Sequence, residues 1–135
     1  MSSLLPLTPI VFPDVELLIC TYLRAQLPLY GFSSVYVSNA RGTQTPAVWV
    51  RRDGGGAMDQ VRAQPRVGIN CYASKEQAVT DLSRTVSALL VAMPNGKPVA
   101  KVDEVTGPSP VADPSGPRRY SVFELILRGV ELHKS

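Results

Sequence analysis

One amphipathic run, residues 78–93, constrains the fold of this chain more than any other feature. Apolar residues recur along it at the three- and four-residue spacing of a helix: Ala78, Val79, Leu82, Val86, Leu89, Leu90 and Met93. Ser74 and Gln77 precede the run with the spacing of a capping box, in which each side chain bonds the backbone at the other residue. We therefore predict a helix that starts near Ser74 and ends at Pro94. Its apolar stripe has to pack against another element.

A second helix is predicted from about Val15 to Leu27. Asp14 precedes it and can accept a hydrogen bond from the free N–H groups of the first turn. Its apolar residues also recur at helical spacing: Val15, Leu18, Ile19, Tyr22 and Leu23. Arg24 suits the last turn because a cation is favourable at the negative end of the helix dipole, and Pro28 ends the pattern.

Five other segments alternate between apolar and other residues with the two-residue period of a strand. They are residues 34–38, 46–52, 66–72, 99–105 and 120–131. A polar turn at residues 39–45 is expected to join the first two strands into a hairpin. The last segment is apolar on both faces, with Tyr120, Val122 and Ile126 on one and Phe123, Leu125 and Leu127 on the other. Such a strand belongs in the centre of a sheet or between two covering layers.

Two segments between these strands predict irregular structure. Residues 53–65 begin with Asp53 and three consecutive glycines, which weaken a strand and favour positive φ, so we expect a flexible loop there. Residues 107–117 contain four prolines and two glycines, a composition that opposes both helix and sheet. We expect this second segment to form an extended arm.

The chain has 135 residues, the size of one domain, and residues 1–135 are expected to form a single unit. Hydrophobic residues make up 44% and charged residues 19%, which is typical of a globular protein and unlike a disordered one. The longest uncharged apolar runs are too short to cross a bilayer. The predicted fold is α+β: a mixed, mostly antiparallel sheet of four to five strands with two helices packed on one face, in the order α-β-β-β-α-β-β.

Most kinds of catalytic and metal site lack the residues that they need. The two cysteines, Cys20 and Cys71, lie in apolar patterns that are typical of buried thiols and not of a disulfide framework. The one histidine, His133, is close to the end of the chain, where an imidazole is not held rigidly. The glycine run lacks the Lys and the Ser or Thr of a phosphate-binding loop. We therefore predict no enzyme activity, no cofactor and no metal site.

The net charge of +3 is small, and the basic residues are scattered along the chain. Basic doublets occur only at Arg51-Arg52 and Arg118-Arg119, which is a weak pattern for a nucleic-acid-binding surface. A small nucleic-acid-binding module that uses these four arginines stays open as an alternative, and strongly salt-dependent binding to DNA would identify it. Trp49 favours a core or interface anchor over base stacking, because no second aromatic residue lies near it on its strand.

Five short stretches occur in an order that spans nearly the whole chain. They are residues 14–18 (DVELL), 46–55 (PAVWVRRDGG), 67–73 (VGINCYA), 77–82 (QAVTDL) and the closing strand from Arg119-Tyr120. Together they resemble the tail terminator family of long-tailed (siphovirus) bacteriophages, especially of phages that infect actinobacteria. Tyr72 stands where such proteins often have tryptophan.

The resemblance implies a structural virion protein without catalytic residues. Members of that family form a hexameric ring at the head-proximal end of the tail tube, where they stop tube polymerisation and join the tail to the neck proteins of the head. The implied partners are other copies of the chain, the tail tube protein and a head-completion or stopper protein. DNA is expected to pass through the ring lumen without sequence-specific binding. The implied location is the tail of the virion, and the host cytoplasm during assembly.

The candidate interface consists of residues in the glycine segment and in both arginine doublets: Arg51, Arg52, Asp53, Gly54, Gly55, Gly56, Arg118 and Arg119. The glycines would let the loop reorder on docking, and the prolines would let the arm reach a neighbour at little cost in entropy. Head-to-tail contacts of this kind can close a ring. Another head–tail connector, a stopper or an adaptor, is the nearest alternative function.

Overall fold

The structure of the chain is a computed structural model, which describes residues 8–95 and 98–132. Its elements are β1 (Ile10–Val11), α1 (Val15–Gln26), a short 3₁₀ helix η1 (Leu27–Tyr30), β2 (Tyr36–Ser38), β3 (Ala47–Ala57), β4 (Arg62–Tyr72), α2 (Glu76–Val91), β5 (Val99–Pro110), β6 (Arg118–Arg128) and β7 (Val130–Glu131). The two helices and the five strands of the main sheet occur in the predicted order, and the α+β class is confirmed. Gly129 divides the predicted last strand into β6 and β7, and β7 pairs with β1 in a separate two-stranded sheet.

The main sheet has the strand order β2-β3-β4-β6-β5. Its neighbouring strands are antiparallel except for β2 and β3, which run parallel with Val37 opposite Val48. The predicted hairpin between β2 and β3 is therefore wrong. Their connection is too long for a tight turn. It returns along the sheet, so that the Arg41 guanidinium lies 3.8 Å from the centroid of the Tyr72 ring.

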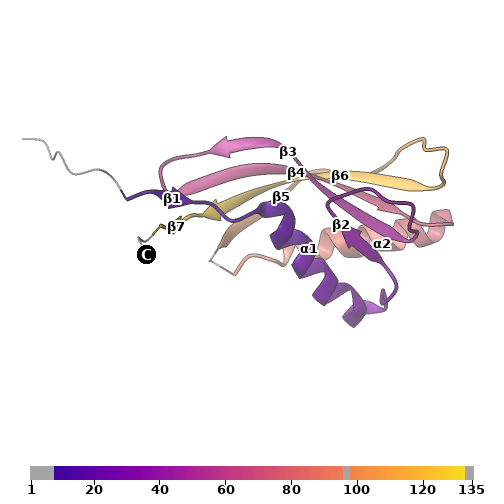
Figure 1. The fold of residues 1–135 in the computed structure, drawn as a ribbon. Coiled ribbons are helices and arrows are strands. Elements are labelled where there is room, and N and C mark those ends of the chain that lie inside the picture. The colour runs from indigo at the N-terminus through magenta and orange to yellow at the C-terminus, as the bar shows by residue number, and fades with distance from the viewer. Residues whose placement is uncertain (1–7, 96–97, 133–135) are drawn as a thin grey trace, which may run out of the picture.

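Both helices lie on one face of the main sheet (Figure 1), as predicted. α1 packs on β2 and β3, whereas α2 packs on β4, β5 and β6. The buried apolar residues of the helices are Val15, Ile19, Cys20 and Leu23 in α1, with Val79, Leu82, Val86, Leu89 and Leu90 in α2. The strands contribute Val37, Val48, Val50, Val67, Ile69, Cys71, Val99, Val102, Phe123, Leu125 and Leu127. Both cysteines are buried free thiols, which confirms the prediction made for them.

The start of one helix agrees with the prediction, and the start of the other does not. Asp14 Oδ1 accepts a hydrogen bond of 3.1 Å from the Leu17 N–H at the first turn of α1. The predicted capping box is wrong, because α2 begins at Glu76 and its N-cap residue is Lys75, whose side chain makes no capping hydrogen bond. Ser74 thus precedes the N-cap position, which is where a hydroxyl caps the free N–H groups of the first turn.

The glycine segment is part of a hairpin, so the prediction of a loop over residues 53–65 is wrong. β3 continues through the glycines to Ala57, β4 begins at Arg62, and residues 58–61 form the turn between them. This distal part of the β3–β4 hairpin extends past both helices at one end of the molecule (Figure 1).

A β-bulge explains how three glycines fit in a strand. The register between β3 and β4 shifts between Arg52 and Gly54. Gly54 and Gly55 have φ of 153° and 81°, and a Cβ at Gly55 would collide with the β4 backbone at Gln64 and Pro65. The glycines permit the left-handed conformation and the close approach of the two strands, so they accommodate the bulge and the strand continues beyond it.

The proline-rich segment is also partly a strand, so the predicted arm over residues 107–117 is only partly correct. β5 continues to Pro110, where Ser109 lies opposite Tyr120 on β6, and residues 111–117 connect the two strands. β5 is the last strand of the sheet, so one side of its backbone has no neighbouring strand. A proline without an N–H group is tolerated in such an edge strand.

β6 lies between β4 and β5, which confirms the central position predicted from its two apolar faces. Phe123, Leu125 and Leu127 are fully buried under the helices. Val122 and Ile126, on the opposite face, are only partly buried. The helices therefore cover one face of β6, and the other face is part of an open surface.

Candidate interaction surface

The face of the main sheet that points away from the helices is here called the outer face. Strand alternation and register place aromatic and charged side chains on it, in contrast to the aliphatic side chains on the helix side. Neither helix covers the outer face (Figure 1). Three residues of the predicted interface, Arg51, Asp53 and Arg118, belong to this surface.

Arginine and tyrosine side chains form a fixed stack at one end of the outer face. The Arg41 guanidinium lies 3.8 Å and the Arg118 guanidinium 5.7 Å from the centroid of the Tyr72 ring. Arg118 also donates from Nε and Nη2 to Asn70 Oδ1, at 2.8 and 2.6 Å. Asn70 and Tyr72 are only 4% exposed although no helix covers them. The two arginines thus cover this part of the sheet, and their charged groups stay at the surface.

Asp113 ties the β5–β6 connection to this stack. Its carboxylate lies 3.6 Å from Arg118 Nη1 and accepts hydrogen bonds from the Ser115 backbone N–H (2.8 Å) and hydroxyl (2.6 Å). These Ser115 hydrogen bonds, together with the charges of Arg118 and Arg41, hold the pKa of Asp113 below its ordinary value. The connection is therefore anchored on the outer face at neutral pH, when the carboxylate is ionised.

The bulge residue Asp53 contacts the central strand across the outer face. The Tyr120 hydroxyl donates a hydrogen bond of 2.8 Å to Asp53 Oδ2. Gly68 lies beneath this contact, because a Cβ at that position would meet both the Asp53 carboxylate and the Tyr120 ring. Burial, followed by the hydrogen bond and the charge of Asp53, raises the pKa of Tyr120. The bulge thus places Asp53 where it fixes the Tyr120 ring on the sheet.

Replacing Tyr120 by phenylalanine is expected to lower the free energy of unfolding at pH 7 by about 0.5–1.5 kcal/mol, since one hydrogen bond is lost. The folded-state pKa lies above the ordinary value of 10.0, so the folded chain keeps a proton that the unfolded chain loses. The contribution of the hydroxyl is complete below pH 10 and is lost as the pH rises through the folded-state pKa. Urea unfolding of both proteins between pH 7 and 11 measures this difference.

The matched control is Tyr36→Phe, at a tyrosine whose hydroxyl makes no hydrogen bond in the described residues. It should change the stability little at pH 7, because no hydrogen bond is lost. If Tyr120→Phe gave the same small change as Tyr36→Phe, the Asp53 contact would not hold the ring.

Trp49 and Arg51 form a second aromatic–cation contact on the outer face. The Arg51 guanidinium lies 5.8 Å from the centroid of the Trp49 ring, and Trp49 Nε1 donates to the Asn39 carbonyl at 3.2 Å. Trp49 is half-buried, and Arg51 is exposed. The ring is held in place while part of its surface remains available to a partner.

Of the other predicted interface residues, Arg52 and Arg119 lie away from this surface, and Gly54, Gly55 and Gly56 belong to the β3 backbone. Arg119 points to the helix side, where Nη2 contacts Glu76 Oε2 at 2.8 Å and Thr80 Oγ1 at 3.3 Å on α2. Arg52 lies at the edge of the sheet and bonds the carbonyls of Gly54 and Gly55. Each arginine doublet is therefore divided between two sides of the sheet, as strand alternation requires.

Several contributors to the outer face lie outside the predicted interface, among them Arg41, Asn70, Tyr72 and Tyr120. The two-residue period places Asn70 and Tyr72 on the same face of β4, which was a usable signal. No local pattern connects Arg41, in the β2–β3 connection, with a ring on β4. That contact depends on the parallel pairing of β2 with β3, because the connection between parallel strands has to return along the sheet.

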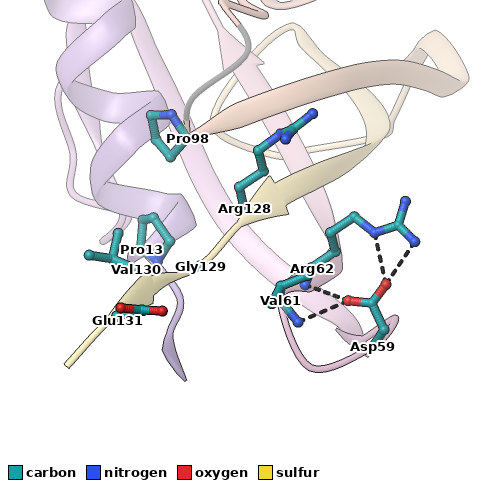
Figure 2. Close-up of a pocket in the computed structure, with 9 residues that line it drawn as sticks. All are labelled: Pro13, Asp59, Val61, Arg62, Pro98, Arg128, Gly129, Val130 and Glu131. Carbon is teal, nitrogen blue, oxygen red and sulfur yellow. Dashed lines mark hydrogen bonds and ion pairs between the residues drawn. The ribbon is translucent and has the colours of Figure 1, made fainter. Parts of the chain in front are cut away.

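A shallow depression lies between β7 and the β3–β4 turn (Figure 2). Val61, Pro98 and Val130 contribute apolar surface to it. Asp59 and Arg62 form an ion pair of 2.7 Å within the β3–β4 turn, and Asp59 Oδ1 also accepts hydrogen bonds from the backbone N–H groups of Val61 and Arg62. These contacts lower the pKa of Asp59 and fix the turn. They bring no nucleophile and base together.

No protein-family model matches the sequence, and no curated protein shows significant similarity to it.

The described residues contain no group of three or more His, Cys, Asp or Glu side chains that could hold a metal ion. None of the helices in this part of the chain is long and apolar enough to cross a membrane. His133 lies outside the described residues. Burial raises the pKa of Cys71 to about 12, so its thiol stays protonated at neutral pH and is unsuited to nucleophilic attack.

The outer face is suited to the recognition of another macromolecule. Tyr, Trp and Arg dominate the binding energy of protein interfaces, because they offer large contact areas with few rotatable bonds. Here the rings of Trp49 and Tyr120 are held by hydrogen bonds, and the Arg41 and Arg118 guanidiniums stack on the buried Tyr72 ring. A partner would therefore meet a preorganised surface.

Proposed function

We propose that this chain is a structural virion protein, the tail terminator of a long-tailed bacteriophage. In this role it forms a ring at the head-proximal end of the tail tube, stops polymerisation of the tube and joins the tail to the neck proteins of the head. The series of sequence stretches described above supports the proposal, and a hexamer is the ring that the resemblance implies. Such a role needs matching surfaces and no catalytic group.

The observation that carries this proposal is that one subunit offers several distinct surfaces. The β3–β4 turn and the β5–β6 connection lie at opposite ends of the main sheet (Figure 1). The sheet also has two edges, an outer face and a helix-covered face. A ring at the end of a tube needs different contacts with the tube, with the neck and with its neighbours, and a subunit of this shape can provide them.

The nucleic-acid-binding alternative has less support, because the basic doublets do not form one surface. Arg118 is held by Asn70 and Asp113, and Arg119 by Glu76. A DNA-binding module would present clustered cations to the phosphates. Another head–tail connector remains the nearest alternative, since it would need similar surfaces.

The proposal is tested by mixing the purified chain with the tail tube protein of the same phage during polymerisation. The tubes are expected to become shorter, with a ring at one end in negative-stain electron micrographs. Labelled antibodies against the chain should bind virions at the junction of head and tail. Unaltered tube lengths together with binding to head particles alone would identify a stopper or adaptor. Absence from virions, or steeply salt-dependent DNA binding, would contradict the proposal.

A further inference from the structure

Part of β3 is an open edge of the main sheet. β2 pairs only with residues 47–49 of β3, and in the described chain no strand lies beside residues 50–57 on that side. An unpaired strand edge exposes N–H and C=O groups to which another strand can bind. This edge is therefore a potential binding site for an extended segment.

Two side chains of the same subunit occupy this edge. The backbone N–H of Arg52 donates to Glu16 Oε2 of α1 at 2.7 Å. The Arg52 side chain donates from Nε to the Gly54 carbonyl at 3.3 Å and from Nη2 to the Gly55 carbonyl at 3.0 Å. Glu16 and Arg52 thus satisfy backbone groups that a neighbouring strand would otherwise bind. Because these contacts are at the surface, a strand can displace them at modest cost.

The opposite edge of the sheet is formed by β5, and one acidic pair on it complements the basic pair of β3. Asp103 and Glu104 lie on β5, whereas Arg51 and Arg52 lie on the open part of β3. The register places Arg51 and Asp103 on the outer face, and Arg52 and Glu104 on the helix side. Each basic residue therefore has an acidic counterpart on the same face of the other edge.

The intramolecular contacts of these acidic residues are weak or absent. Asp103 forms a single exposed ion pair with Lys101, at 3.3 Å, and such pairs contribute little to stability. Glu104 forms no ion pair with any described residue and is exposed. The Glu104 carboxylate is therefore free to bind a partner, and the Asp103 carboxylate can exchange its exposed ion pair with Lys101 for one with a partner.

We propose that residues 50–57 of β3 pair with β5 of a second copy of this chain, and that Glu16 and Arg52 cap the β3 edge in the free subunit. This inference rests on the proposed ring and identifies its subunit contact. The contact joins two different edges, so its repetition from copy to copy can close a ring. Within one sheet β5 runs antiparallel to β3, so similarly oriented neighbours would pair antiparallel. On pairing, the Arg52 guanidinium leaves the glycine carbonyls and binds the acidic residues of the neighbour.

The cap is tested with Glu16→Ala, which removes the acceptor of the Arg52 N–H and keeps both charged edges. This variant is expected to self-associate at about tenfold lower concentration than the unmodified chain, because the edge no longer has to be uncapped. Sedimentation velocity over a concentration series measures the change. Asp81→Ala removes one exposed carboxylate from α2 and should leave self-association unchanged. If Glu16→Ala associated no more readily than Asp81→Ala, the cap would be refuted.

The pairing itself is tested by exchanging charges in the Glu16→Ala background. One variant carries Arg51→Glu and Arg52→Glu, and the other carries Asp103→Arg and Glu104→Arg. Each alone should fail to assemble, because its two edges then carry like charges. An equimolar mixture should assemble, because every contact in an alternating ring is again between opposite charges. Circular dichroism and thermal unfolding confirm that both variants are folded. Normal assembly of either variant alone, or failure of the mixture, would overturn the pairing.

These outcomes are separate from those of the tube experiment. If each charge-exchanged variant alone stopped tube growth as well as the unmodified chain, the terminator role would be supported and this contact would be contradicted. If only the mixture of the two variants assembled, and the unmodified chain had no effect on tube length, the contact would be supported and the terminator role would be contradicted.

Discussion

Replacing Leu125 by alanine is expected to lower the free energy of unfolding by about 2–5 kcal/mol. Leu125 is fully buried in β6, the strand between β4 and β5, beneath the helices. Its removal leaves a cavity in addition to the lost burial of the side chain, and a central strand surrounded by other strands cannot easily move to fill it. Leu82→Ala on α2 is expected to fall in the same range, because that side chain is 1% exposed in the same core.

The next residue of β6, Ile126, is the matched control. Its side chain is of similar size but lies on the outer face, where it is only partly buried. Ile126→Ala is expected to cost about 1 kcal/mol or less in the isolated chain. Urea unfolding measures both losses of stability. The slope of the free energy of unfolding against urea concentration should be the same for the variants as for the unmodified chain. Equal losses for the two variants would mean that something covers the outer face as completely as the helices cover the other.

Replacing Gly55 by alanine is expected to destabilise the folded chain by about 1–3 kcal/mol. Gly55 has φ of 81°, which side chains rarely adopt, and the added Cβ would collide with the backbone of Gln64 and Pro65. Since these atoms belong to the β4 backbone, which cannot rotate away as a side chain can, the distal part of the β3–β4 hairpin would have to separate. Hydrogen exchange of the amides in residues 54–66 should therefore accelerate along with the loss of stability.

Gly56→Ala is the matched control in the same strand. Gly56 has no positive φ, and no atom lies within 4 Å of the position that its Cβ would take. Alanine there restricts the unfolded chain without straining the folded one, so a gain of about 0.4–1 kcal/mol is expected. If Gly55→Ala were also stabilising, the segment would be the flexible loop that its composition suggests and not a strand.

The candidate surface illustrates why sequence reasoning recovered only part of the site. Arg51, Asp53 and Arg118 were predicted and lie on the outer face, because charged residues in strands with one buried side tend to face away from the core. The predicted interface also includes Arg52 and Arg119, which are their neighbours in the sequence. In a strand, adjacent side chains point in opposite directions, so each doublet divides between two environments. The contacts of Arg41 with Tyr72 and of Tyr120 with Asp53 join distant parts of the chain, and no local pattern contains them.

Elements with a local signal could be predicted from the sequence: α1 with its Asp14 cap, the apolar stripe of α2, and the two-residue alternation of the strands. Spacing alone specifies these, because the 3.6- and 2-residue periods are properties of a single segment. Three features depend on contacts between distant parts of the chain: β2 lies parallel to β3, the glycines continue β3, and β5 extends into the prolines. A strand is defined by the backbone that pairs with it, and for these segments β4 and β6 supply pairing that outweighs the weak preferences of glycine and proline.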